Sequence, residues 1–273
     1  SIEKSIGFVK LSNSRTTVII DAAPPPVGKK AEKADASTLA FEMVSGQRRI
    51  FTSCGPGYLF GSNLSSASRQ TSSHSVVYID NQNSSQFSDK ESWLKVPKKV
   101  IINGPRNVPK EISNDQGICI FEGAHDGYVK SHGLTHVRKL KLAQDGQTFE
   151  GEDLIIAIED SHKRQFDKIS KKTSRGSLSV KAAFHLHPDV TLRLDQENNF
   201  ISLALKNGEV WIFNYSSDLN LDLETTVFFE NDLFEPLRSQ KLILSADLLD
   251  YGTIIKWSIA RACNKDLSVG DLL

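Results

Sequence analysis

The sequence predicts an all-β protein, built as one large antiparallel β-sandwich with few or no helices. Apolar and polar residues alternate with a period of two along much of the chain, as in strands with one buried face. No long segment shows the 3.6-residue period of an amphipathic helix. Gly, Asn and Asp turn signals separate many short alternating segments at the spacing typical of sandwiches.

The N-terminal part predicts a strand followed by a hairpin. Residues 16–21 alternate, and the run Pro24-Pro25-Pro26 ends them because proline cannot donate to a ladder. Residues 39–44 and 49–53 flank the turn signal Ser45-Gly46-Gln47. This pattern indicates a β-hairpin with one buried face.

Two polar passages follow in which we expect irregular structure. The Gly- and Ser-rich residues 55–73 are expected to cross the surface and deliver His74 to the start of a strand at 75–80. His125-Asp126-Gly127-Tyr128 is expected to form a loop, in which the glycine sets a turn and Tyr128 fills either the core or a cleft.

The middle of the chain predicts a strand at residues 134–143, ended by a turn at Asp145-Gly146. Its alternation places His136 and Arg138 on one face together with Leu140 and Leu142. The next apolar strand is expected at residues 153–160. Residues 161–177 are hydrophilic and basic, which indicates a long solvated loop, or a loop that contacts an anionic glycan.

The C-terminal half predicts a regular run of strands, two of them joined by the hairpin turn Asn207-Gly208. His185 and His187 are two residues apart on one strand and therefore share a face. They are interpreted as half of a metal site, as lining of a glycan groove, or as exposed or hydrogen-bonded histidines. The remaining expected strands lie at residues 98–103, 117–122, 178–187, 191–194, 200–205, 209–215, 224–229, 239–245 and 253–260.

Composition excludes several classes of protein. The chain of 273 residues has 33 Lys plus Arg and 33 Asp plus Glu, so no overall charge favours nucleic acid or an anionic membrane as a partner. No apolar run reaches the length of about 20 residues that a membrane-spanning helix needs. Three cysteines (Cys54, Cys119, Cys263) lie far apart, which argues against a disulfide framework. Since the chain begins at Ser1, we expect it to be cut from a longer protein or processed.

Familiar catalytic motifs do not occur in the chain. The sequence has no G-x-S-x-G elbow, no Gly-rich phosphate loop and no H-E-x-x-H motif. Glu152 and Asp153 form an acidic pair, but adjacent residues on a strand point to opposite faces. They are therefore a poor pair of carboxylates for a glycosidase.

Five stretches, in the same order along the chain, resemble the C-terminal β-domain of heparinase II/III-like polysaccharide lyases. The resemblance runs over almost the whole of residues 1–273, which we interpret as one domain of the layered sandwich kind. The stretches are GFVKLSNSRTTVIIDAAPPP (7–26), AHDGYVKSHGLTHVRKLKLAQDGQTFEGEDLI (124–155), FHLHPDV (184–190), NGEVWIF (207–213) and the closing strand around Trp257.

The resemblance implies that the protein takes part in cleaving uronate-containing polysaccharides by β-elimination. Such a site must neutralise a carboxylate, remove the adjacent proton and protonate the leaving oxygen. In the family an N-terminal (α/α) helical toroid, absent from this chain, supplies most of these groups. The chain alone is therefore expected to be inactive, or to be a non-catalytic carbohydrate-binding or structural module. His74 matches a histidine of the family and is a candidate for catalysis. His136 and Arg138 are candidates for offering a cation to the uronate carboxylate, or they have purely structural roles. Tyr128, His185 and His187 are the candidates for binding an acidic polysaccharide.

The family's zinc ligands are mostly replaced in this chain. The sequence has A-D-A-S around Asp35 where the family often has A-H-A-G, and Ser53 where an acidic ligand often lies. His74 matches a family histidine, so Asp35, Cys54 and His74 are the remaining candidates for zinc. The other interpretation is that no cofactor binds and that His74 is a structural residue, hydrogen-bonded at the head of its strand.

The sequence is compatible with more than one cellular compartment. The family's usual work on external glycans implies the periplasm or cell envelope, whereas three unpaired cysteines suit the cytoplasm equally well. The sequence does not identify the polysaccharide.

Overall fold

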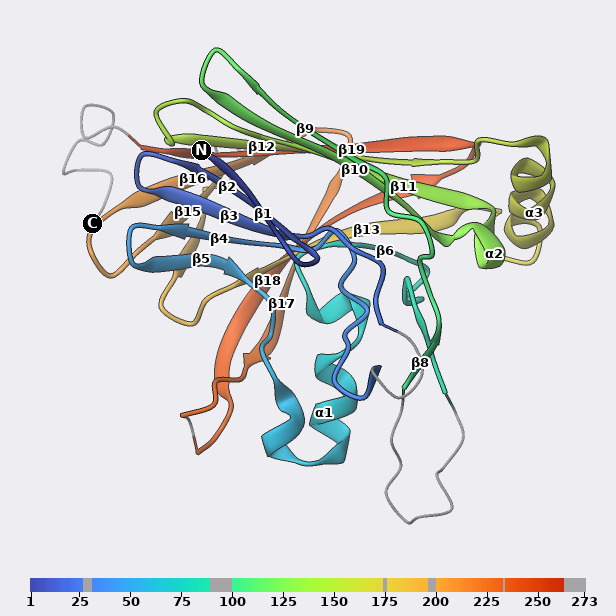
Figure 1. The fold of residues 1–273 in the computed structure, drawn as a ribbon, viewed down its shortest axis with the longest axis horizontal. Coiled ribbons are helices and arrows are strands. Elements are labelled where there is room, and N and C mark those ends of the chain that lie inside the picture. The colour runs from blue at the N-terminus through green and yellow to red at the C-terminus, as the bar shows by residue number, and fades with distance from the viewer. Residues whose placement is uncertain (27–30, 89–99, 174–175, 196–199, 233, 263–273) are drawn as a thin grey trace.

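The computed structural model describes residues 1–26, 31–88, 100–173, 176–195, 200–232 and 234–262. Two large antiparallel sheets pack into a sandwich, with short helices at its lower side and right-hand end (Figure 1). The predicted all-β sandwich is confirmed, and each residue pair in its ladders is antiparallel.

One sheet has nine strands in the order β1-β2-β3-β4-β5-β13-β18-β17, and β6 pairs with β13. The strands are β1 (Ile2–Ser5), β2 (Phe8–Asn13), β3 (Thr16–Asp21), β4 (Phe41–Ser45), β5 (Arg48–Thr52), β6 (Val77–Ile79), β13 (Leu178–Leu186), β17 (Asn220–Phe228) and β18 (Leu237–Leu248).

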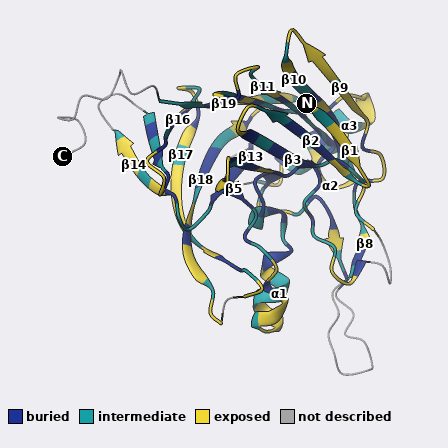
Figure 2. Cartoon of the chain, turned by 60° about the vertical axis from the view of Figure 1, so that its left-hand side comes forward, coloured by how far each residue is buried: buried dark blue, intermediate teal, exposed yellow. Residues whose placement is uncertain are grey.

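The second sheet has eight strands in the order β14-β15-β16-β19-β12-β11-β10-β9, and β7 pairs with β8 in a small separate ribbon. The strands are β7 (Gln86–Phe87), β8 (Ile101–Asn103), β9 (Lys110–Asp115), β10 (Ile118–Tyr128), β11 (Leu134–Leu142), β12 (Thr148–Ile156), β14 (Thr191–Asp195), β15 (Phe200–Ala204), β16 (Val210–Tyr215) and β19 (Gly252–Arg261). Exposed residues dominate the edge strands β9 and β14, while the central strands are mostly buried (Figure 2).

An aromatic cluster fills the space between the two sheets. Trp257 of β19 stacks on Phe41 of β4 at 5.3 Å between ring centroids and meets Phe184 of β13 edge-on at 4.8 Å. Gly151 of β12 lies opposite Trp257, and a Cβ atom there would come within 2.1 Å of the indole ring. The bare glycine therefore makes room for the largest side chain of the core.

The first hairpin and the strand at 16–21 are confirmed as β4–β5 and β3. The surface passage expected at 55–73 is instead folded into short helices, because its serines bond the backbone locally: Ser68 Oγ donates to Ser65 O, and Ser73 Oγ donates to Ala67 O. These helices are η2 (Gly57–Phe60), α1 (Ser62–Ser68) and η3 (Thr71–Ser73).

The expectation of a long basic loop at 161–177 was wrong, since α3 (Asp160–Ser170) occupies most of it. Glu159 and His162 form a reciprocal capping box at its start, and Phe166 packs edge-on against the ring of Tyr251 at 5.7 Å. The preceding strand, expected at 153–160, is β12, which begins earlier and ends at Ile156. Part of the expected loop, residues 174–175, lies outside the described residues.

The loop expected at His125–Tyr128 is the end of β10, where the pairing with β11 shifts between His125 and Tyr128. The turn that we expected at the glycine is therefore a β-bulge inside a strand. Helix α2 (Val129–His132) follows directly and turns the chain into β11.

Cys54 and Cys119 are free and buried, and Cys263 lies outside the described residues. In the described ranges, no helix has the length and apolar character needed to cross a membrane.

Candidate functional site

A cavity of about 380 Å³ lies beside the first hairpin, and we call it the His74 cavity. Asp21 enters from the end of β3, Glu42 from β4 and Asp35 from the segment between these strands. Ser53 follows β5, and His74 follows η3. Acidic side chains and a histidine therefore meet at one opening beside the β4–β5 hairpin.

His74 is buried, and neither of its ring nitrogens has a hydrogen-bond partner in the described structure. Burial lowers the pKa of His74 to about 3, assisted by the neighbouring His185, so the imidazole is neutral at pH 7. Its backbone N–H donates to Thr71 O, but the expected side-chain hydrogen bond at the head of the strand is not made. An unpaired imidazole inside a protein costs free energy and is left available to a ligand.

Two carboxyl groups of the His74 cavity have raised pKa values. Burial raises the pKa of Asp21 to about 6, although Ser37 Oγ donates a hydrogen bond to it at 2.7 Å. Burial also raises the pKa of Asp35 to about 6, against the attraction of Arg69 at 3.9 Å. The Asp35 side chain keeps 41% of its surface exposed, so solvent weakens the effect there. Both groups are nevertheless suited to exchange a proton near neutral pH.

The three residues predicted to hold zinc do not assemble around one point. Cys54 Sγ lies 3.6 Å from both Gly55 O and Ser68 O, and burial raises the pKa of its thiol to about 12. A zinc ligand has to be a thiolate, which this environment disfavours. Over the described ranges, no group of three or more His, Cys, Asp or Glu side chains is arranged to hold a metal ion. The residues present therefore do not fit zinc, and no step below involves it.

His136 and Arg138 lie inside the sandwich, where they contact Asp153. His136 Nε2 is 2.8 Å from Asp153 Oδ1, and Arg138 donates to both carboxylate oxygens at 2.7 and 3.0 Å. All three side chains are fully buried. Burial alone raises the pKa of Asp153, but Arg138 and His136 outweigh it and hold that pKa well below its usual range.

The hydrogen bonds around Asp153 fix the state of two histidines. Because the carboxylate accepts from His136 Nε2, the Nδ1 atom of a neutral His136 must accept, and His125 Nε2 donates to it at 3.2 Å. His125 Nδ1 in turn accepts the Gly127 N–H at 3.1 Å. Burial lowers the pKa of both histidines, which keeps them neutral. Their burial and mutual bonding argue against the predicted contact of His136 and Arg138 with a substrate.

Asp153 is the residue that sequence reasoning missed. It was set aside with Glu152 as a poor glycosidase pair, and the two side chains do face opposite sides. Its importance follows from the register, which places Arg138 of β11 directly opposite Asp153 of β12. An acidic residue at an inward position of an apolar strand was the available signal.

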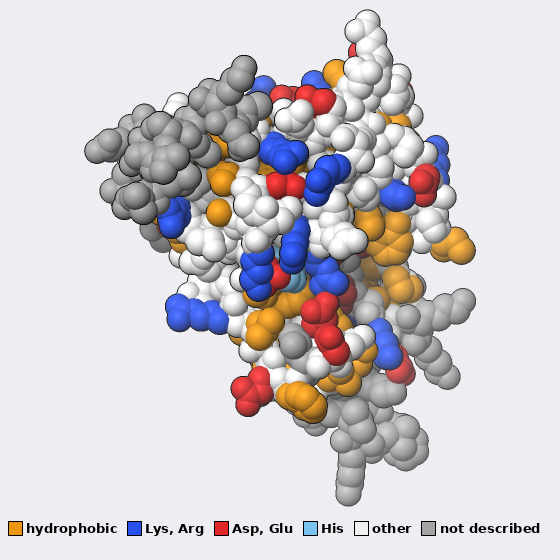
Figure 3. Space-filling view, turned by 90° about the vertical axis from the view of Figure 1, so that its left-hand side faces the viewer, with side chains coloured by type: hydrophobic (Ala, Val, Ile, Leu, Met, Phe, Trp, Pro, Cys, Tyr) orange, Lys and Arg blue, Asp and Glu red, His pale blue; other side chains and the backbone are white. Residues whose placement is uncertain are grey.

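The predicted binding residues do not meet in one groove. Tyr128 is buried and donates its hydroxyl to Val77 O at 3.3 Å, so it fills the core. His185 is buried and its Nε2 lies 2.9 Å from Ser72 O, whereas its Nδ1 has no partner in the described structure. His187 lines a separate hollow with Arg48 and Arg49. Figure 3 shows Lys and Arg side chains gathered on the end of the sandwich that faces the viewer.

Comparisons with known proteins agree with this architecture. The family model described as "Heparinase II/III-like, C-terminal" matches residues 4–258. FtsZ-localized protein C of Caulobacter vibrioides is 26% identical over 259 residues, which are 94% of this chain and 42% of that protein.

Solved structures of two lyases have the same fold. The heparinase III that is the BT4657 gene product superposes with a TM-score of 0.69 at 13% identity, over 97% of this chain and 36% of that one. The heparan sulfate lyase HepC from Pedobacter heparinus gives a TM-score of 0.68 at 15% identity, over 96% and 36% of the two chains. The chain thus spans less than half the length of these relatives.

Proposed function

Since the chain belongs to the heparinase II/III-like C-terminal family, we propose that it is the β-sandwich portion of a polysaccharide lyase. The parent protein would cleave a uronate-containing polysaccharide by β-elimination, with this domain forming one wall of the cleft. An N-terminal (α/α) toroid of the same parent would form the other wall. The match of the family model over residues 4–258 and the partial coverage of the relatives support this proposal.

The observation that carries the proposal is the combination of groups at the His74 cavity. β-Elimination needs a group that removes the proton next to the carboxylate and a group that protonates the leaving oxygen. A carboxyl group with a pKa near 6, such as Asp21, is protonated in part of the population near neutral pH and can donate that proton. In the described structure the neutral His74 ring has no hydrogen-bond partner, so it can position a hydroxyl or carboxylate of the sugar.

The low pKa of His74 explains why the chain alone should be inactive. A histidine with a pKa of about 3 is a weak base, because it holds a proton poorly at the pH where the enzyme works. His136 and Arg138 are bonded to Asp153 and are fully buried in the core. The base and the group that neutralises the uronate must then come from the rest of the parent.

A second candidate function is a non-catalytic carbohydrate-binding or structural module. The replacement of the family's zinc ligands at Asp35 and Ser53 favours it, as does the name of the Caulobacter relative, which records localisation with FtsZ and no reaction. In this case His74 and the raised pKa values of Asp21 and Asp35 serve binding only. We also propose a location in the periplasm or cell envelope, because the family acts on external glycans. This location fits either function.

Turnover by the parent protein separates the two candidates. The assay follows the absorbance of unsaturated uronate products from acidic polysaccharides, with the isolated chain and the full parent side by side. His74→Leu and Asp35→Asn in the parent are expected to lower kcat at least tenfold, and Asp247→Asn, an exposed carboxylate on β18, is the matched control. A parent that binds glycans but releases no product would favour the non-catalytic module.

A further inference from the structure

The buried Arg138 guanidinium makes contacts beyond its ion pair. Its Nη1 atom donates to two backbone carbonyls of other segments, to Leu39 O at 2.8 Å and to Ser75 O at 3.0 Å. Nη1 carries two hydrogens, so this one nitrogen can serve both acceptors. Ser75 directly follows His74, and Leu39 directly precedes Ala40. Both contacts therefore lie one residue away from the lining of the His74 cavity.

Leu39 has a backbone conformation that needs support from its surroundings. Its φ of +66° lies in the left-handed region, which leucine adopts only where neighbouring groups fix it. Two hydrogen bonds hold the residue from opposite sides. Leu39 N–H donates to Asp21 O at 2.7 Å, and Leu39 O accepts from Arg138. Arg138 thus fixes one side of a strained residue between β3 and β4.

This strained residue belongs to a tight turn that delivers a hydroxyl to the Asp21 carboxyl. Ala40 N–H donates to Ser37 O at 2.7 Å, which closes a β-turn that we call the Leu39 turn (Ser37–Ala40). Ser37 Oγ donates to Asp21 Oδ2 at 2.7 Å. One residue, Thr38, separates Leu39 from Ser37. The position of the hydroxyl therefore depends on how the turn is held.

The second carbonyl contact of Arg138 supports another wall of the His74 cavity. Ser75 O accepts from Arg138 and also from Phe41 N–H at 3.3 Å. The Arg138 guanidinium carbon lies 5.4 Å from the centroid of the Phe41 ring. Because the His74 ring has no hydrogen-bond partner in the described structure, its position depends on these neighbours.

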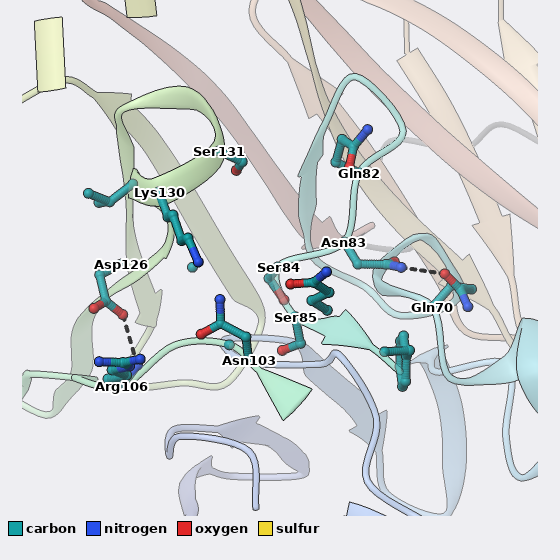
Figure 4. Close-up of a pocket in the computed structure, with 15 residues that line it drawn as sticks. Gln70, Gln82, Asn83, Ser84, Ser85, Asn103, Arg106, Asp126, Lys130 and Ser131 are labelled. Atoms are coloured by element: carbon teal, nitrogen blue, oxygen red, sulfur yellow. Dashed lines mark hydrogen bonds between the residues drawn. The ribbon is translucent and has the colours of Figure 1, made fainter. Parts of the chain in front are cut away.

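The network around Asp153 has a second arm that leads elsewhere. His136 Nδ1 accepts from His125 Nε2, and His125 Nδ1 accepts the Gly127 N–H. Gly127 lines a cavity of about 890 Å³ between the segment 82–87 and the end of β10 (Figure 4). The two arms thus end at different cavities, so each arm can be disturbed separately.

We propose that Arg138 is a positioning residue, which aligns the Ser37 hydroxyl with the Asp21 carboxyl through the Leu39 turn. Asp153 orients the guanidinium from its other side, with bonds of 2.7 and 3.0 Å. Arg138 acts from the core through the backbone and has no need to touch a substrate. Lysine cannot replace it, because a single ammonium lacks the fork that bonds the carboxylate and the carbonyls together.

A double-mutant cycle between Arg138 and Ser37 tests the alignment in the isolated chain. The carbon chemical shift of the Asp21 carboxyl, followed as the pH is varied, gives its pKa. Ser37→Ala is expected to raise this pKa, because the hydroxyl stabilises the carboxylate. In the Arg138→Lys background the increase should shrink to less than half. An increase that stays above half, or no increase in the original chain, would overturn the proposal.

The other arm of the network provides the matched control. His125→Gln disturbs a side chain that is as deeply buried as Arg138 and should leave the effect of Ser37→Ala unchanged. If His125→Gln reduced that effect as much as Arg138→Lys does, general loosening of the core would be its cause, and the proposal would fail.

Two variants of Thr38 test the same transmission without disturbing the buried ion pair, which matters if Arg138→Lys does not fold. Thr38 is buried, and its hydroxyl has no partner in the described structure. Thr38→Ala should therefore preserve the effect of Ser37→Ala. Thr38→Gly frees the backbone between Leu39 and Ser37 and should at least halve it. Equal effects in the two Thr38 variants would contradict transmission through the turn.

Turnover by the parent extends the test, and this part rests on the proposed function. Arg138→Lys should lower kcat about fivefold or more and leave KM within about twofold, because alignment serves proton donation by Asp21 and not binding. If the pKa cycle behaves as expected but kcat is unchanged, the role of Asp21 in the reaction is refuted while the positioning by Arg138 stands.

Discussion

Arg138 and Asp153 form a two-point ion pair inside the sandwich, with Arg138 Nε 2.7 Å from Oδ1 and Nη2 3.0 Å from Oδ2. Arg138 Nη1 also donates to Leu39 O and Ser75 O, at 2.8 and 3.0 Å. The pair therefore ties β11 and β12 of one sheet to two segments of the other layer. Trp257 Nε1, 3.3 Å from Asp153 Oδ2, joins this pair to the aromatic core.

Neutralising the buried carboxylate should strongly destabilise the domain. Asp153→Asn leaves the Arg138 charge buried without its counter-ion, and we expect a loss of about 3–5 kcal/mol in the free energy of unfolding. Urea unfolding of the isolated chain measures this loss. Glu122→Gln is the control, because it breaks an exposed pair with Lys139 on the neighbouring β10–β11 ladder and should cost about 0–1 kcal/mol. Equal effects of the two changes would contradict a structural role for Asp153.

Acid should destabilise the domain through its buried histidines. In the folded chain the pKa values of His125 and His136 lie below the ordinary histidine value of 6.5, because burial disfavours the imidazolium. The unfolded chain thus binds more protons, so stability falls as the pH drops below about 6.5. Nitrogen chemical shifts of the two rings should change to those of imidazolium at a lower pH than 6.5, and titration of both rings at or above pH 6.5 in the folded chain would refute the assignment.

Replacing His74 with an apolar residue should separate stability from function. Since neither ring nitrogen is hydrogen-bonded in the described structure, His74→Leu is expected to be neutral or to stabilise the fold by about 1 kcal/mol. Thermal unfolding of the chain measures stability, and turnover by the parent measures function. A marked loss of stability would mean that the imidazole has a structural partner after all.

The Asp21 carboxyl should have the opposite pH dependence to the histidines. Its pKa of about 6 in the folded chain exceeds the ordinary aspartate value of 3.8, so the stability it contributes is present below pH 3.8 and is lost as the pH rises through 6. Asp21→Asn keeps an oxygen that can accept from Ser37 Oγ and should be more stable than the wild type above pH 6, but not at pH 4. Denaturation at both pH values tests this sign, and a difference that is the same at pH 4 and pH 8 would contradict it.

Alternation along the strands predicted much of the fold, and it placed His136 and Arg138 on the inner face of β11 with Leu140 and Leu142. Alternation could not show that the inner face of β11 is closed to solvent. A buried ion pair on that face can be recognised only when the opposite residue on the neighbouring strand is known. Helix α3 could not be predicted from the sequence pattern either. Only Phe166 and Ser170 are buried along it, so its apolar stripe is too thin to produce a helical period.

The candidate cavities were harder to predict than the strands. His74 and Asp35 were singled out in the sequence, but their common opening with Asp21 depends on how β3, β4 and the segment after β5 meet. The cavity lined by Gln82, Gln86 and Asn103 gave no signal, since carboxamides in separate polar segments resemble ordinary surface loops until the fold brings them together.

Turnover by the parent and by this chain, measured in one assay of unsaturated uronate release, shows whether this domain serves a polysaccharide lyase. We predict product formation by the full parent, no detectable product from the isolated chain, and at least a tenfold loss of kcat in the parent carrying His74→Leu. Robust product formation by the isolated chain, or full activity of the parent without the His74 imidazole, would contradict it.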